Sequence, residues 1–159
     1  MKQATKSPTL CIVSPSINEY SETFINAHIE LLPAKILVLY GPNLNQLKEF
    51  NSNKPINKNF TLTIHVRHSF ARRITGEKWK DIQKRSFINF LRKNRVDAVL
   101  AEYGPTGVFL IESCVESNIP LIVNFHGYDA YIYNILKKFE FGYQNLFKNA
   151  ASLLLSLIT

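Results

Sequence analysis

Short segments that are apolar along their whole length restrict the fold of this chain more than any other feature. A strand with one solvated face alternates apolar and polar residues, whereas an uninterrupted apolar run is typical of a strand buried on both faces. Such strands belong to parallel sheets whose connections are helices. The predicted strands occupy residues 10–13, 35–40, 60–66, 98–101, 120–125 and 153–155.

Amphipathic stretches separate these segments and predict helices. The first starts near Ser21 and is ended by Pro33, and the longest covers residues 77–94 with an apolar stripe at helical spacing. Two further helices are expected at 106–117 and 143–149, and a loop, or a loop with a short helix, at 41–59. The alternation predicts an α/β fold of Rossmann-like type, with an open, mostly parallel sheet and helices on both faces.

A length of 159 residues suits one domain with a real core and is too short for two complete α/β domains. We therefore expect residues 1–159 to form one domain. The two cysteines, Cys11 and Cys114, lie in apolar segments and are expected to be reduced core thiols. With no signal-peptide pattern and no apolar run long enough to span a bilayer, we expect a cytoplasmic protein that is at most peripheral at the inner face of the membrane.

The formal net charge is +7, and the basic residues concentrate between Arg67 and Arg95. Such a surface attracts anions, which include nucleic acid, an anionic membrane and phosphate-bearing substrates, and charge alone does not choose among them. A basic helix is most often a solvated face. The more specific interpretation is that the 77–94 helix docks to an anionic membrane surface.

Three polar segments follow predicted strands, at the edge where open parallel sheets bind ligands. They are residues 14–22, 102–107 and 126–129. Two of them lead into helix starts, where free backbone N–H groups favour an anion, and Gly104 lets the backbone come close to a ligand.

Each residue singled out here also has a purely structural interpretation. His126 is either a functional side chain or a turn residue, and Asp129 is either a site residue or the cap of the next helix. Ser21 and Glu22 are equally well explained as a helix start, and His28 as a partly buried histidine with a structural partner. His65 and His68 do not share a strand face, so no zinc site is predicted. Glycine-rich dinucleotide and phosphate loops and the nucleophile elbow are missing.

Four segments together resemble bacterial family 4 glycosyltransferases, which build capsule, colanic-acid-type and other polysaccharides. The chain is similar to that family at the first helix, at the second loop, at a strand followed by His-Gly-x-Asp, and at a helix before a final apolar strand. These segments are Ser21-Glu-Thr-Phe-Ile with Ala27-His-Ile, Ala101-Glu-Tyr-Gly-Pro-Thr-Gly-Val, Ile119-Pro-Leu-Ile-Val-Asn-Phe-His-Gly-Tyr-Asp-Ala, and residues 143–156.

The resemblance implies a retaining, metal-independent transferase of GT-B type, built from two Rossmann-like domains around a cleft. This chain would be the amino-terminal domain, which mainly holds the acceptor. His126 would lie near the transferred sugar as the catalytic candidate, Gly127 would keep its loop tight, and Asp129 would anchor the loop or contact the acceptor. The substrate-binding candidates lining the same cleft are Ser21, Glu22, Tyr103, Gly104, Gly127 and Asp129.

The resemblance stops before the donor-binding domain, and the amino-terminal domain itself looks cut short. We therefore expect no transferase activity from the chain alone, no cofactor, and a nucleotide-sugar co-substrate that needs the other domain. The expected partners are a sugar or lipid-linked acceptor and an anionic membrane surface, not nucleic acid. The alternative is a non-catalytic module that binds the acceptor or the membrane surface. A response-regulator-like domain is disfavoured, because residues 10–15 carry no acid.

Overall fold

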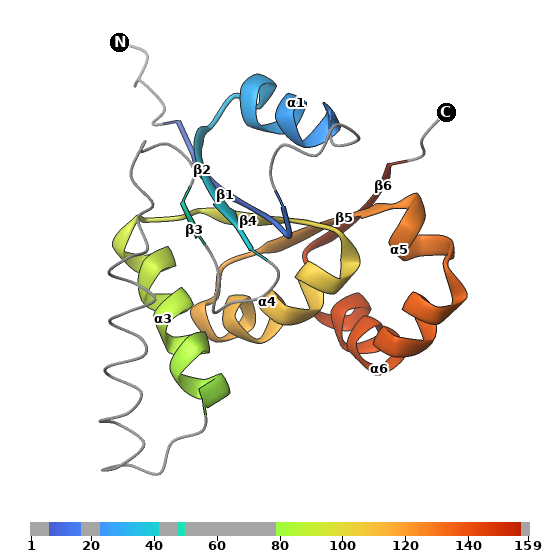
Figure 1. Cartoon of the computed structure of the whole chain (residues 1–159). Helices are drawn as coiled ribbons and strands as arrows, with labels where there is room; N and C mark the ends of the chain where they lie inside the picture. The colour runs from blue at the N-terminus through green and yellow to red at the C-terminus, as the bar shows by residue number, and fades with distance from the viewer. Residues whose placement is uncertain (1–6, 17–22, 42–47, 50–78, 157–159) are drawn as a thin grey trace.

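The computed structural model describes residues 7–16, 23–41, 48–49 and 79–156, and the fold below concerns these residues (Figure 1). They form a single open sheet with helices packed against it. The strands are β1 (Thr9–Ser14), β2 (Lys35–Tyr40), β3 (Lys48–Glu49), β4 (Ala98–Glu102), β5 (Leu121–His126) and β6 (Ser152–Ser156).

The strand order is β3-β2-β1-β4-β5-β6. Five strands, from β2 to β6 in that order, pair in parallel, and only the two-residue β3 runs antiparallel to its neighbour β2. The prediction of an open, mostly parallel sheet is confirmed. β3 lies in the 41–59 segment, where we expected a loop with at most a short helix, so that prediction was wrong for these two residues. An edge strand this short has too few residues for apolar periodicity to announce it.

Helices cover both faces of the sheet, as predicted. Figure 1 shows α1 on one side and α3, α4 and α6 together on the other. The helices are α1 (Thr23–Leu31), α3 (Trp79–Lys93), α4 (Gly104–Ser117), α5 (Gly127–Tyr131) and α6 (Tyr133–Asn149). None of the helices in the described part of the chain is long and apolar enough to span a membrane.

Two predicted boundaries were wrong. The segment after β5 is not a loop, because α5 begins at Gly127 directly after the strand. α6 begins ten residues earlier than the predicted Tyr143. Its packed side chains include Leu136, Phe139, Tyr143 and Leu146, whose spacing of three and four residues is that of a helix face. The predicted strand at 60–66 lies outside the described residues.

The main core lies between the sheet and the helices α3, α4 and α6. Alternate residues of the strands, such as Val99 and Val123, point into it and meet Leu110 of α4 and Leu146 of α6. Cys11 and Cys114 belong to this core and are at most 1 % exposed. The prediction that both cysteines are buried is therefore confirmed.

The opposite face of β4 and β5 carries polar residues near the strand ends. Glu102 is the last residue of β4 and is paired in register with Asn124 of β5, and His126 ends β5. All three residues are at most 2 % exposed. The chain moves from β1 outward to β2 and β3 and then returns to the other side of β1 as β4. The strand order therefore reverses at β1, and the carboxyl ends of the strands beside such a reversal are the usual ligand position in open parallel sheets.

Candidate functional site: a buried carboxylate between two histidines

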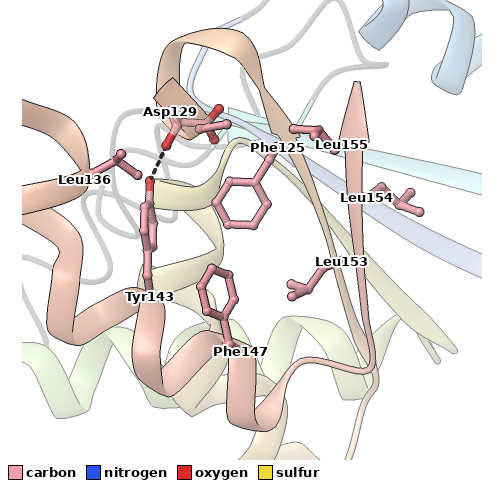
Figure 2. Close-up of a pocket in the computed structure, with 9 residues that line it drawn as sticks. Phe125, Asp129, Leu136, Tyr143, Phe147, Leu153, Leu154 and Leu155 are labelled. Carbon is pink, nitrogen blue, oxygen red and sulfur yellow. Dashed lines mark hydrogen bonds between the residues drawn. The ribbon is translucent and has the colours of Figure 1, made fainter. Parts of the chain in front are cut away.

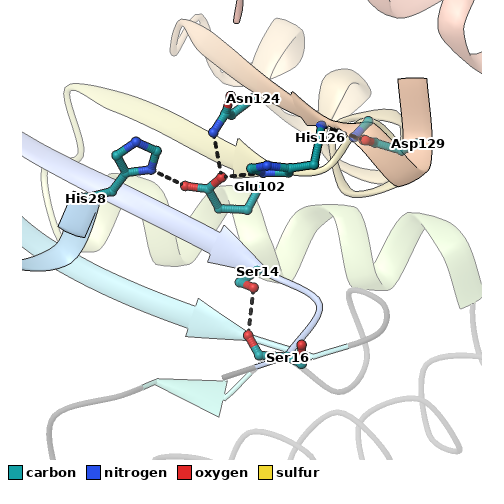
Figure 3. A network of polar contacts seen from close by, with 8 residues as sticks. Ser14, Ser16, His28, Glu102, Asn124, His126 and Asp129 are labelled. Atoms are coloured by element: carbon teal, nitrogen blue, oxygen red, sulfur yellow. Dashed lines mark hydrogen bonds and ion pairs between the residues drawn. The ribbon is translucent and has the colours of Figure 1, made fainter. Parts of the chain in front are cut away.

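Glu102 is the centre of a polar network at this end of the sheet (Figure 3). One of its carboxylate oxygens lies 2.6 Å from Nδ1 of His28, on helix α1. The other accepts a hydrogen bond of 3.1 Å from the Asn124 side-chain amide and lies 3.1 Å from Nε2 of His126. A fully buried carboxylate is unfavourable unless it is hydrogen-bonded, and these three contacts meet that need.

The carboxyl group of Glu102 is held in its ionised form. Burial by itself raises the pKa of the group, but the hydrogen bonds from His126, His28 and Asn124 outweigh it, and the pKa lies below the ordinary value. An ionised carboxylate only accepts hydrogen bonds. The two ring nitrogens that face it, Nδ1 of His28 and Nε2 of His126, therefore carry hydrogen and donate to it.

The imidazole of His126 is enclosed on all sides. Its ring stacks on Phe24 of α1, with centroids 4.1 Å apart, and contacts the Tyr103 ring at 4.4 Å. Its Nδ1 atom is buried and makes no regular hydrogen bond within the described part of the chain. That atom belongs to a capping-box arrangement with the backbone N–H of Asp129 at the start of α5. The side chain is thus fixed in position and shielded from solvent.

Asp129 joins two loops that are distant in sequence. It is fully buried, and its carboxylate accepts a 2.6 Å hydrogen bond from the backbone N–H of His126 and another from the backbone N–H of Gly104. The start of α4 is thereby tied to the start of α5. These contacts agree with the interpretation of Asp129 as a helix cap and a loop anchor.

Tyr103 has an unusual backbone conformation between β4 and α4. Its φ of 74° with ψ of 141° is a region that side-chain-bearing residues rarely adopt. The surroundings hold it there: its N–H donates to the Asn124 carbonyl at 2.9 Å, and its ring contacts His126. Backbone strain of this kind gathers at functional sites, where the structure around it over-determines the conformation.

The two glycines proposed for the site have different surroundings. A Cβ at Gly104 would collide with the ring of Phe125 and lie 2.8 Å from the hydroxyl of Tyr143, so close packing inside the protein requires this glycine. A Cβ at Gly127 would meet nothing within 4 Å, and the φ angle of Gly127 is not positive. The expectation that Gly127 keeps the loop tight thus has no steric support, and open space lies beside its Cα.

An apolar pocket of about 250 Å³ lies beside α5, between α6 and the strands β5 and β6 (Figure 2). The ring of Phe125 and the side chains of Phe147 and Leu153 line it. The hydroxyl of Tyr143 donates to the backbone carbonyl of Asp129 at 3.3 Å. Burial, aided by the charge of Asp129, raises the pKa of Tyr143, which keeps this donor protonated.

The structure brings together most of the residues predicted for the site. His126, Tyr103, Gly104, Gly127 and Asp129 lie around the adjacent ends of β4 and β5. Ser21 and Glu22 lie outside the described residues, as do His65 and His68. His28 has the structural partner that we expected of it, namely Glu102.

Sequence reasoning missed the two residues that organise the network, Glu102 and Asn124. A signal for both is present, because each places a polar side chain at or near the end of an otherwise apolar run. The described residues contain no group of three or more His, Cys, Asp or Glu side chains arranged to hold a metal ion.

Neither protein-family models nor curated protein sequences match this chain.

Proposed function

We propose that this chain is the acceptor-side, amino-terminal domain of a retaining, nucleotide-sugar-dependent glycosyltransferase of cell-surface polysaccharide synthesis. It would form one half of a two-domain enzyme of GT-B type. The order of the four motifs along the chain supports this proposal, as does the Rossmann-like strand order, which reverses at β1. Fold alone does not define a function, so the argument depends on the site.

The observation that carries the proposal is the meeting of three motif segments in one network. Phe24 and His28 come from the first helix motif, Glu102 and Tyr103 from the second loop, and His126 from the His-Gly-x-Asp motif. One hydrogen bond between these segments, from His28 to Glu102, joins residues that are 74 positions apart in the chain. Residues that serve only local turns would have no reason to converge on one buried carboxylate.

In this proposal the network fixes the junction between β5 and α5, and the exposed residues at that junction contact the acceptor. Asp129 and Glu102 fix the backbone before α5, so that the junction needs little ordering when a ligand binds. Gly127 leaves open space at the start of α5, and the neighbouring Tyr128 side chain is 60 % exposed. A sugar ring would lie over Gly127, with an aromatic surface beside it. The nucleotide sugar would be held by the donor-binding domain, and the chain alone would not transfer sugar.

The proposal is tested by filling the space at Gly127. Methyl glycosides of common hexoses are titrated into the purified chain at millimolar concentration, and binding is followed by saturation-transfer NMR. Gly127→Ala is expected to bind at least one glycoside nearly as the wild type does, whereas Gly127→Leu is expected to lose binding with an unchanged melting temperature. UDP- and GDP-sugars are expected to show no nucleotide contacts. The proposal fails if no glycoside binds, or if Gly127→Leu binds normally.

A module that docks to a membrane surface is the second candidate, and the carboxyl end of α3 favours it. Arg92, Lys93 and Arg95 are exposed there, whereas Lys84, further up the helix, pairs with Glu116 at 2.7 Å. Sedimentation with anionic vesicles separates the two candidates. Binding to anionic but not neutral vesicles, lost on replacing all three residues by Gln, would support docking, whereas equal binding to both lipids would remove it.

A further inference from the structure

The two histidines that share Glu102 differ in exposure. The side chain of His126 is 3 % exposed, whereas that of His28 is 28 % exposed. In His126, Nε2 is directed to Glu102, Nδ1 faces the start of α5, and aromatic rings cover the imidazole. A ligand therefore cannot reach a nitrogen of His126 without moving Phe24, Tyr103 or α5.

His28 has one nitrogen committed to the network and one directed elsewhere. Its Nδ1 donates to Glu102, so the neutral ring carries its lone pair on Nε2. The two nitrogens flank Cε1 of the imidazole and point in different directions, so Nε2 is directed away from the carboxylate that Nδ1 contacts. Nε2 of His28 is either accessible to solvent or hydrogen-bonded, because the buried side-chain atoms without a partner in the described part of the chain do not include it.

We infer that Nε2 of His28 accepts a hydrogen bond from a hydroxyl group of the acceptor sugar, and that Glu102 is the positioning residue that fixes the required tautomer. This inference rests on the proposed function and moves the ligand contact from His126 to His28. A carboxylate behind an imidazole orients the ring and fixes which nitrogen carries hydrogen, as in carboxylate–histidine pairs at other sites. Polyols suit this acceptor because they present several hydroxyl donors.

The tautomer is measured first, in the free protein, by NMR of chains with ¹⁵N-labelled histidine. The expected result is hydrogen on Nδ1 of His28 and on Nε2 of His126. In Glu102→Gln the His28 ring is expected to become a tautomer mixture, because the amide can donate as well as accept. Finding hydrogen on Nε2 of His28 in the wild type would overturn the inference, whether or not any sugar binds.

The ligand contact is measured by titrating the same methyl glycosides into three variants. His28→Ala is expected to bind about threefold to tenfold more weakly, the usual size of one lost hydrogen bond. His28→Gln is expected to recover part of the affinity, because its amide can donate to Glu102 and its carbonyl can accept from the sugar. Asn26→Ala, at an exposed position of the same helix, is the matched control and is expected to bind as the wild type does.

The outcomes separate this inference from the proposed function. Glycoside binding that is equal in the wild type and His28→Ala would overturn the inference and leave the proposed function standing. If the wild type binds no glycoside, the proposed function fails and the ligand contact fails with it. Weaker binding by His28→Ala, partial recovery by His28→Gln and a shift of the His28 Nε2 resonance on titration would together support the inference.

Discussion

Nδ1 of His28 and a carboxylate oxygen of Glu102 lie 2.6 Å apart, although 74 positions separate the two residues in the chain. This contact links α1, on one face of the sheet, to the end of the central strand β4. Glu102 is fully buried, so salt and solvent screen this contact less than they screen a pair on the surface. It connects the stability of the domain to the ionisation of one carboxyl group.

The first prediction concerns acid stability. The folded protein lowers the pKa of Glu102 from its ordinary value of 4.5, because hydrogen bonds to the carboxylate outweigh the effect of burial. A lowered pKa stabilises the fold above the unfolded-state value, and that stabilisation is lost as pH falls through the folded-state value. We expect Glu102→Gln to lower the free energy of unfolding at neutral pH by about 1–3 kcal/mol. As the pH falls below 4.5, the variant is expected to lose less of its remaining stability than the wild type loses.

Urea denaturation at a series of pH values measures this effect. Glu30→Gln, at an exposed position on α1, is the matched control and is expected to follow the wild-type profile. Parallel acid profiles for the wild type and Glu102→Gln would show that Glu102 is not the linked group.

The second prediction compares the two glycines. Gly104→Ala places a methyl group against Phe125 and Tyr143 and is expected to destabilise the domain by about 1–3 kcal/mol, the usual range for overpacking. Gly127→Ala enters open space and is expected to change stability by less than about 0.5 kcal/mol, as surface substitutions do. Thermal unfolding of both variants checks this, and equal melting temperatures would contradict it.

The third prediction concerns the backbone of Tyr103. Both Tyr103→Ala and Tyr103→Gly remove the ring that contacts His126, but only glycine adopts a φ of 74° without strain. We therefore expect Tyr103→Gly to be more stable than Tyr103→Ala by about 1 kcal/mol. Chemical denaturation of the pair measures the difference directly. If the alanine variant were the more stable one, the backbone would not be strained at this residue.

The fourth prediction concerns the thiols. Cys11 and Cys114 lie in the core, and burial raises the pKa of Cys114 to about 12. Because the thiolate is the reactive form, neither residue is expected to react with an aromatic disulfide reagent at pH 8 while the protein is folded. Both thiols are expected to react rapidly with the reagent in about 6 M guanidinium chloride, which unfolds ordinary domains. Rapid reaction of one thiol in buffer would show that its part of the core opens readily.

The amino-acid sequence by itself determined the sheet. Uninterrupted apolar runs such as 10–13 are typical of strands covered on both faces, and helical connections between such strands favour parallel pairing. Local periodicity also placed α4 and the buried cysteines correctly. Where it failed, at β3, α5 and the first part of α6, the segments were short or carried many polar residues beside a narrow apolar stripe.

The tertiary structure alone decided how the site is arranged. Nothing in the residues around Glu102 announces that His28 and His126 will donate to it, because such contacts depend on strand order and on the packing of α1. The same holds for Gly104, which looked like a ligand-approach residue and is required by the ring of Phe125. Periodicity reports which face of an element is buried, whereas the partner of a buried polar group is chosen by residues far away in the chain.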